Sequence, residues 1–171
     1  MRRIVGERLT KHDVEKIEKE IEYRKLVVRK DAIEAVKEAR AQGDLSENFE
    51  YYAAKKEKNQ NESRIRYLER MIRTAKVVSD ESKDDEVGLY NTVDVYFEDD
   101  DETEVFKLVT SVRGSSLNGK ISIESPIGKA IMKHRAGDRV YVKVNDNAGY
   151  YVVIRSVEKT DGEEEDAIRK Y

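Results

Sequence analysis

The sequence predicts an α+β protein, in which an antiparallel two-helix coiled-coil hairpin is followed by a small antiparallel sheet domain with one short helix. Three observations lead to this prediction. Residues 10–42 contain neither proline nor glycine and repeat apolar side chains at helical spacing. Residues 88–158 alternate apolar and polar side chains with the period of a strand. With 38% hydrophobic and 40% charged residues, the chain suits a narrow helical seam and a small sheet better than one large core.

The first predicted helix covers residues from about 10 to 42. Its apolar or small side chains recur in steps near three and four residues, as in a coiled-coil seam. The predicted seam positions are Val14, Ile17, Ile21, Val28, Ala32, Ala35 and Ala39.

The second predicted helix covers residues from about 45 to 78, and its seam positions are Ala54, Ile65, Leu68, Ile72 and Ala75. Lys58 and Asn61 occupy positions where apolar residues are expected, which weakens the middle of the pairing. Gly43 is the only break between the helices, and glycine suits the position that ends a helix. The link is too short for anything except a reversal, so residues 43–48 form the far end, or tip, of an antiparallel hairpin.

The remainder of the chain is predicted to form the sheet domain. An acidic linker precedes five strand segments, and a short helix interrupts the strands, with Ser125 as its N-cap, Pro126 at its first position and Gly137 just past its end. The predicted parts of the chain are the hairpin (1–79), the linker (80–87), the sheet domain (88–158) and an acidic tail expected to be mobile (159–171).

Composition excludes several classes of protein. The chain has no cysteine, so it has neither disulfides nor thiolate metal sites, and His12 and His134 are too far apart to suggest a metal-binding pair. No apolar stretch has the length of an export signal core or a membrane span, so we expect a cytoplasmic protein without membrane contact. Residues 1–78 carry 20 Lys+Arg against 15 Asp+Glu, whereas residues 79–171 carry 13 against 21. This asymmetry indicates two modules with different partners.

Two carboxylates follow the tip glycine, and their spacing has two interpretations. Asp44 and Glu47 match a capping box, in which the first side chain caps the second helix and the other folds back onto its amide. The same pair could instead present oxygen ligands to Mg²⁺, with a second protein supplying the rest. The spacing alone favours capping and does not exclude the metal.

Two stretches resemble the bacterial GreA/GreB family of transcript-cleavage factors. The tip run "GDLSENFEY" (43–51), followed by Ala53, Ala54 and Lys55, is similar to the hairpin tip of that family. The segment "GKISIESPIGKAIMKHRAGDRVYV" (119–142) is similar to its C-terminal domain, and the order and separation of the two stretches also agree. The basic residues and the C-terminal match favour GreA over GreB.

The resemblance implies a fold, a partner and site residues. It implies that the second domain is FKBP-like and docks on RNA polymerase, and that the hairpin enters the polymerase's secondary channel as a monomer. Asp44 and Glu47 would then be catalytic, holding a Mg²⁺ shared with the polymerase while its active site cleaves the 3′ end of backtracked nascent RNA. The protein would supply carboxylates without being an enzyme alone. Ser125 and Pro126 would lie near the docking surface.

Lysines behind the tip are candidates for RNA contact. Lys55 falls where the family has a basic residue, and it lies about two turns behind the tip; Lys56 and Lys58 follow it. Residues 50–76 hold eight basic groups against four acidic ones, which favours contact with a phosphate chain. Direct contact with DNA is left open. His12-Asp13 and Arg24 depart from the family pattern, and we expect these departures to affect only the packing of the seam.

Three alternatives remain open at this stage. An inhibitory relative would occupy the same channel and block the polymerase without stimulating cleavage, although such proteins carry a more heavily acidic tip. A prolyl isomerase would need an aromatic-lined pocket in residues 88–158, where strand packing can account for the aromatic residues. A plain coiled-coil scaffold would use Asp44 and Glu47 for stability alone.

Overall fold

A computed structural model describes residues 6–43, 47–114, 118–160 and 168. The chain divides into two compact units. The first, the hairpin unit, contains Val14–Lys76 and the residues before Arg8, and the second, the sheet unit, contains Arg8–Asp13 and the chain from Val77 onward. The boundary therefore falls inside the first turn of the first helix.

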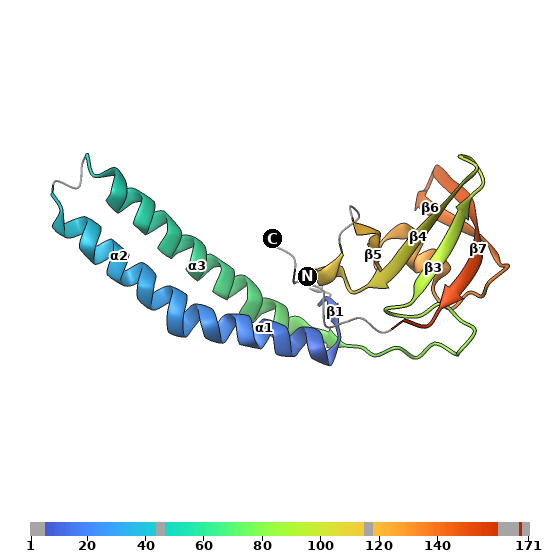
Figure 1. Ribbon diagram of the computed structural model, residues 1–171, viewed down its shortest axis with the longest axis horizontal. Helices are drawn as coiled ribbons and strands as arrows, with labels where there is room; N and C mark the ends of the chain where they lie inside the picture. The colour runs from blue at the N-terminus through green and yellow to red at the C-terminus, as the bar shows by residue number, and fades with distance from the viewer. Residues whose placement is uncertain (1–5, 44–46, 115–117, 161–167, 169–171) are drawn as a thin grey trace. The chain divides into compact units, whose positions relative to one another are not determined.

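The hairpin consists of one nearly continuous helical rod and a second helix beside it. The first rod comprises α1 (Lys11–Tyr23), a π-helical segment η1 (Arg24–Val28) and α2 (Arg29–Ala41). The returning helix α3 (Phe49–Thr74) has 26 residues, so it is about 39 Å long at 1.5 Å per residue. Figure 1 shows α2 and α3 lying side by side and antiparallel, which confirms the predicted hairpin.

The π-helical segment explains a polar residue that the sequence placed in the seam. The Arg24 carbonyl accepts the N–H of Arg29, five residues on, and also accepts a hydrogen bond from the Asn61 side chain at 3.2 Å. The Arg24 guanidinium donates to the Asn61 oxygen at 3.1 Å and to Glu20 at 2.7 Å. Glu20 also receives two hydrogen bonds from Arg64, at 2.9 and 3.2 Å. Asn61 and Arg64 are both buried, so the middle of the hairpin is held by a polar network.

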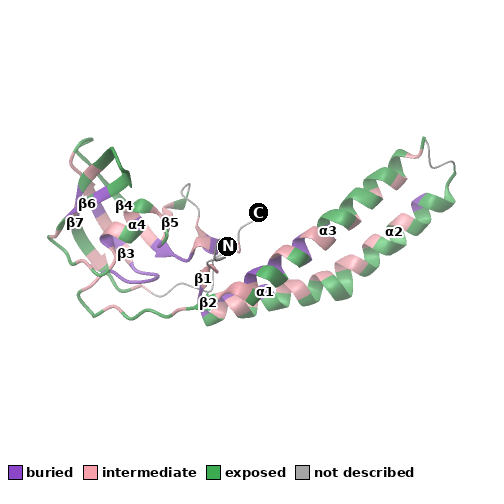
Figure 2. Ribbon diagram, turned by 180° about the vertical axis from the view of Figure 1, so that it is seen from behind, coloured by how far each residue is buried: buried purple, intermediate pink, exposed green. Residues whose placement is uncertain are grey.

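Apolar packing is concentrated near the base of the hairpin, at the end of α3. Ile17, Ile65 and Leu68 are fully or almost fully buried there, and buried residues in Figure 2 are frequent in this part of α3. The seam prediction is wrong at Ala35, which is exposed, while Val36 is half-buried in its place. The π-helical turn holds one more residue than an α-helical turn, so spacing extrapolated across it changes register.

The sheet unit is a five-stranded sheet with strand order β5-β4-β3-β7-β6. Its strands are β3 (Thr92–Phe97), β4 (Glu102–Val109), β5 (Lys120–Ser122), β6 (Arg139–Asn145) and β7 (Ala148–Glu158). All neighbours pair antiparallel except β4 and β5, which are parallel. Two further short strands, β1 (Arg8–Leu9) and β2 (Lys76–Val77), flank the helices in the sequence. The five predicted strands and the largely antiparallel sheet are confirmed.

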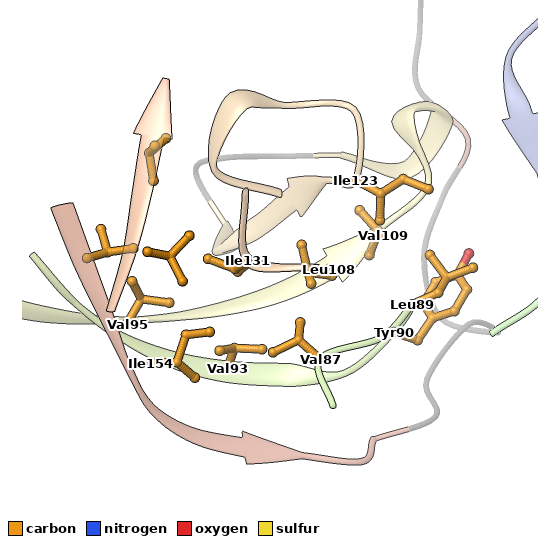
Figure 3. Close-up of a cluster of buried hydrophobic side chains, with 13 residues drawn as sticks. Val87, Leu89, Tyr90, Val93, Val95, Leu108, Val109, Ile123, Ile131 and Ile154 are labelled. Carbon is orange, nitrogen blue, oxygen red and sulfur yellow. The ribbon is translucent and has the colours of Figure 1, made fainter. Parts of the chain in front are cut away.

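Aliphatic side chains fill the core of the sheet unit. Val93 and Val95 of β3, Leu108 of β4 and Ile154 of β7 are fully buried in one cluster, which Figure 3 shows. Ile131, from the helix α4 (Pro126–Ile131), belongs to the same cluster. Buried residues alternate with half-buried ones along β3 and with exposed ones along β6, which is the pattern from which the strands were predicted.

The boundaries of the sheet unit differ in detail from the predicted segments. Val87, the last residue of the predicted linker, is fully buried in the core. The first two residues of the predicted tail also belong to this unit. The Lys159 ammonium donates to the Asn91 side chain at 3.0 Å, and the Thr160 hydroxyl donates to the Tyr90 carbonyl at 2.7 Å. The rest of the predicted tail, except residue 168, lies outside the described residues.

The hairpin tip as the candidate functional site

Asn48 closes the described part of the hairpin tip. It is the N-cap of α3: its side-chain oxygen accepts the Tyr51 N–H at 3.0 Å. Its side-chain amide donates to the carbonyl of Ala39, in the last turn of α2, at 2.6 Å. One asparagine side chain therefore caps one helix and ties it to the end of the other. Asp and Ser cap helices equally well but carry no amide donor for the second bond.

The capping box predicted from the sequence is therefore wrong. Helix α3 begins at Phe49, not near residue 45, and its cap is Asn48, not Asp44. Gly43 does end the first rod, as predicted: it follows the C-cap Gln42 and has a φ of +146°, which side-chain-bearing residues rarely adopt.

Glu47 directly precedes the N-cap, and its side chain is exposed. Glu47 takes no part in the hydrogen bonds by which Asn48 caps α3. It is close in sequence to the positive end of the helix dipole, which favours a carboxylate. Its predicted partner, Asp44, lies outside the described residues.

An exposed carboxylate is a suitable ligand for Mg²⁺, which prefers oxygen donors in octahedral geometry. Glu47 supplies at most two of those donors. Within residues 6–43, 47–114, 118–160 and 168, no three His, Cys, Asp or Glu side chains gather into a cluster that could hold a metal. A Mg²⁺ site at the tip therefore stays a prediction, and Glu47 is the predicted ligand that falls among the described residues.

The three predicted RNA-contacting lysines do not lie on one face of α3. Lys55 is exposed, with its ammonium 6.0 Å from the centre of the Tyr51 ring. Lys56 is also exposed, whereas Lys58 is half-buried. Because successive helical residues point about 100° apart, one ligand strand cannot meet all three in the same way. Their contact with RNA stays a prediction, and the geometry favours Lys55 and Lys56 over Lys58.

Tyr51 links the two helices behind the tip. Arg40 of α2 lies over its ring, 5.6 Å from the centroid, and Lys55 lies near it on α3. A hydrogen bond from Arg40 lowers the pKa of the Tyr51 hydroxyl, and the charges of Lys55 and Lys58 act in the same direction. These contacts give Tyr51 a packing role between the two helices. The part played by Arg40 could not be predicted, because it depends on the pairing register of α2 and α3.

Ser125 and Pro126 form the predicted helix start. The Ser125 hydroxyl accepts the Gly128 N–H at 3.1 Å and donates to the Ser122 carbonyl at 2.6 Å, and Pro126 is the first residue of α4. A side chain at Gly128 would meet that same carbonyl at 2.1 Å, so the turn requires glycine there. The helix ends at Ile131, well before Gly137, so that part of the prediction is wrong; Gly137 instead occupies the turn into β6 with a φ of +93°.

The sequence analysis missed a buried charged cluster in the sheet unit. Asp13 and Arg113 form an ion pair in which both side chains are fully buried, and Asp13 also accepts a hydrogen bond from the Thr110 hydroxyl at 2.8 Å. Thr10 and Asp13 form a reciprocal capping box at the start of α1, with bonds of 2.9 and 3.1 Å. The Thr-x-x-Asp spacing was a usable signal for this capping box. We expected Asp13 to affect seam packing alone, and this expectation is wrong.

Comparison with known proteins gives the family. The model of the N-terminal domain of the transcription elongation factors GreA and GreB matches residues 7–77, and the model of their C-terminal domain matches residues 81–159. The chain belongs to the GreA/GreB family. It is therefore a transcription elongation factor of the transcript-cleavage class, as the sequence predicted, and the inhibitory alternative has less support.

Individual relatives agree with this assignment. The chain is 46% identical over 137 residues to transcription elongation factor GreA of Thermoanaerobacter pseudethanolicus, covering 80% of this chain and 87% of the relative. It is 43% identical over 153 residues to GreA of Streptococcus pneumoniae serotype 19F, covering 89% and 95%. Among solved structures, the chain is similar to Thermus aquaticus Gfh1, with 25% identity, a TM-score of 0.42, and coverage of 90% of this chain and 99% of that one.

In the described residues, no helix is both long enough and apolar enough to cross a membrane.

Proposed function

We propose that this GreA-family protein binds RNA polymerase in the cytoplasm as a monomer, places its hairpin in the secondary channel and stimulates Mg²⁺-dependent cleavage of the 3′ end of backtracked RNA. The observation that carries the proposal is that different residues of the tip cap the helix and expose a carboxylate. Asn48 makes the capping bonds, which leaves the exposed carboxylate of Glu47 available for another role.

Glu47 and Asp44 are proposed to present carboxylate oxygens to a Mg²⁺ held jointly with the polymerase. When bound there, the ion would lower the pKa of water and neutralise charge developing on the phosphate. Glu47 would orient the attacking water through its second oxygen, since each carboxylate oxygen accepts more than one bond. The rigid bonds of Asn48 would fix the direction from which Glu47 approaches. The role of Asp44 rests on the family match alone.

Lys55 is proposed to contact the phosphates of the backtracked RNA, with a smaller part for Lys56, and the region of Ser125 and Pro126 is proposed to dock on the polymerase. Lys55→Glu should slow cleavage of long backtracked segments more than removal of a dinucleotide, because only long segments reach back along α3. The matched control is Lys30→Glu, which reverses an exposed lysine on α2. Equal slowing of long and short cleavage would remove the RNA contact from the proposal.

The test of the proposal uses a stalled, backtracked bacterial elongation complex with 3′-labelled RNA and Mg²⁺. The protein should release short 3′ fragments, while Asp44→Asn and Glu47→Gln should not, at concentrations where all three are shown to bind the complex. Blocked elongation without fragments would identify an inhibitor that uses the same channel. Full cleavage by both variants would reduce the two carboxylates to a structural role.

A further inference from the structure

The side of α3 next to the tip carries an exposed stripe of two aromatic residues and a lysine, defined here as Phe49, Tyr52 and Lys56. Phe49 has 86% of its surface exposed, the largest fraction among the large hydrophobic side chains that the structure describes. Tyr52 is 52% exposed, and Lys56 is also exposed. The spacings of three and four residues place all three side chains along the same side of the helix.

Folding of the hairpin does not account for this stripe. The tip is closed by Asn48, and Tyr51 packs towards Arg40. The residues of α3 that are buried begin at Asn61, several turns away. Tyr52 contributes an edge-on contact to Tyr51, with ring centres 5.6 Å apart, and this contact leaves about half of Tyr52 in solvent. A phenylalanine exposed to water two residues after Glu47 therefore points to a ligand.

The chemistry of the stripe matches a single-stranded nucleotide. Exposed aromatic rings beside cationic side chains are the usual platform for unpaired bases, because every base offers a π-face and every linkage offers a phosphate. Lys56 follows Tyr52 by one helical turn, and Lys55 and Arg40 add positive charge near Tyr51. An apolar protein groove would match the two rings but would leave the adjoining ammonium group without a counter-charge.

We propose that Phe49, supported by Tyr52, stacks on an unpaired base of the displaced RNA 3′ segment, while Lys56 contacts the adjoining phosphate. This inference rests on the proposed function, since it requires RNA at the tip. Stacking would hold the segment against α3 and so limit how far the phosphate beside Glu47 moves before cleavage. Larger purine rings should be held more firmly than pyrimidines.

The test uses backtracked complexes whose displaced RNA carries 2-aminopurine, a base whose fluorescence falls when it is stacked. The factor carries Glu47→Gln so that the RNA stays intact during the measurement. Binding of this factor should quench the fluorescence, and adding Phe49→Ala should abolish most of the quench, whereas Phe49→Tyr should keep it. In the background with Glu47 intact, Phe49→Ala should slow cleavage by roughly 5-fold or more, the scale of one lost base–aromatic stack.

Controls separate stacking from other effects. Leu26→Ala removes another exposed apolar side chain of the same hairpin, 66% exposed, and should leave the quench unchanged. If Phe49→Ala instead weakens binding equally to complexes with a normal and an abasic displaced nucleotide, Phe49 contacts polymerase protein and the inference is overturned. Absence of any quench also overturns it. A quench without cleavage by the unsubstituted factor would support the stacking while contradicting the proposed function, so the two failures are distinguishable.

Discussion

The middle of the hairpin and the core of the sheet unit bury very different side chains. In the hairpin, Glu20, Arg24, Asn61 and Arg64 form a connected set of ion pairs and hydrogen bonds across the two helices. In the sheet unit, thirteen buried side chains form one cluster of aliphatic residues and a tyrosine. The stability that apolar burial provides does not depend on the protonation of side chains. The stability of a polar network depends on pH, on salt and on the presence of every partner. The hairpin is therefore the part of the molecule whose stability should respond to pH and salt.

Asp13→Ala should have the largest effect on stability, and it tests the limit of the comparison because the Asp13–Arg113 pair is a fully buried ion pair within the sheet unit. Loss of Asp13 leaves the fully buried Arg113 without its carboxylate, which typically costs about 3–5 kcal/mol. Denaturant unfolding followed by a probe in the sheet unit measures this loss. A cost below about 1 kcal/mol would mean that solvent reaches Arg113 in the variant.

Leu108→Ala should destabilise the sheet unit by about 2–5 kcal/mol, because it leaves a cavity in a fully buried site of the aliphatic core. Leu26→Ala makes the same chemical change on the hairpin, where the side chain is 66% exposed, and should stay within about 0.5 kcal/mol of the unsubstituted protein. Similar losses for the two variants would contradict the assigned burial. Paired denaturation curves provide the measurement.

Acid should weaken the hairpin before it weakens the aliphatic core. Burial raises the pKa of Glu20, but hydrogen bonds from Arg64 and Arg24 outweigh it and lower the pKa below 4.5; Arg29 similarly lowers the pKa of Glu62. A carboxyl group whose pKa is lower in the folded than in the unfolded protein contributes its full stabilisation above about pH 4.5. This contribution is lost as the pH falls through the pKa of the folded state. Amide exchange should therefore accelerate in α3 below about pH 4.5, ahead of β3 and β7. Simultaneous acceleration in both units would remove the distinction.

Asn48→Ala should cost about 1 kcal/mol of stability, less than either core substitution, because one N-cap bond and one bond to Ala39 are lost at an exposed end. Cleavage by this variant should fall even under conditions where the protein remains folded, since the substitution releases the segment that carries Glu47. Asn48→Ser is the matched control: its hydroxyl can cap α3, but its shorter side chain lacks the amide that donates to Ala39. If Asn48→Ser cleaves normally, the cap alone positions the tip.

The spacing of apolar residues and the positions of glycine and proline were sufficient to predict the two helices, the five strands and the reversal at Gly43. Each of these features depends on residues that are neighbours in the sequence. The π-helical turn at Arg24 and the pairing of Asp13 with Arg113 could not be predicted in this way, since each is decided by partners 37 and 100 residues away. At the tip, the role predicted for Glu47 stays a prediction, whereas the spacing favoured Asp44 as the cap and the structure has Asn48 there. Asn48 was the better N-cap because its amide also reaches Ala39, a contact that exists only once the helices are paired.

The most direct test of the central claim is to measure unfolding and Mg²⁺-dependent cleavage for the single variant Glu47→Gln. Because Asn48 makes the capping bonds, we predict that the variant unfolds within about 0.5 kcal/mol of the unsubstituted protein. Its cleavage in a backtracked complex should fall at least about tenfold and require more Mg²⁺, because loss of a group that only orients a metal ligand already costs about 10- to 100-fold in metal affinity or activity. Unchanged cleavage, or lost cleavage that parallels lost stability, would contradict the claim that Asn48 holds the tip while Glu47 performs its chemistry.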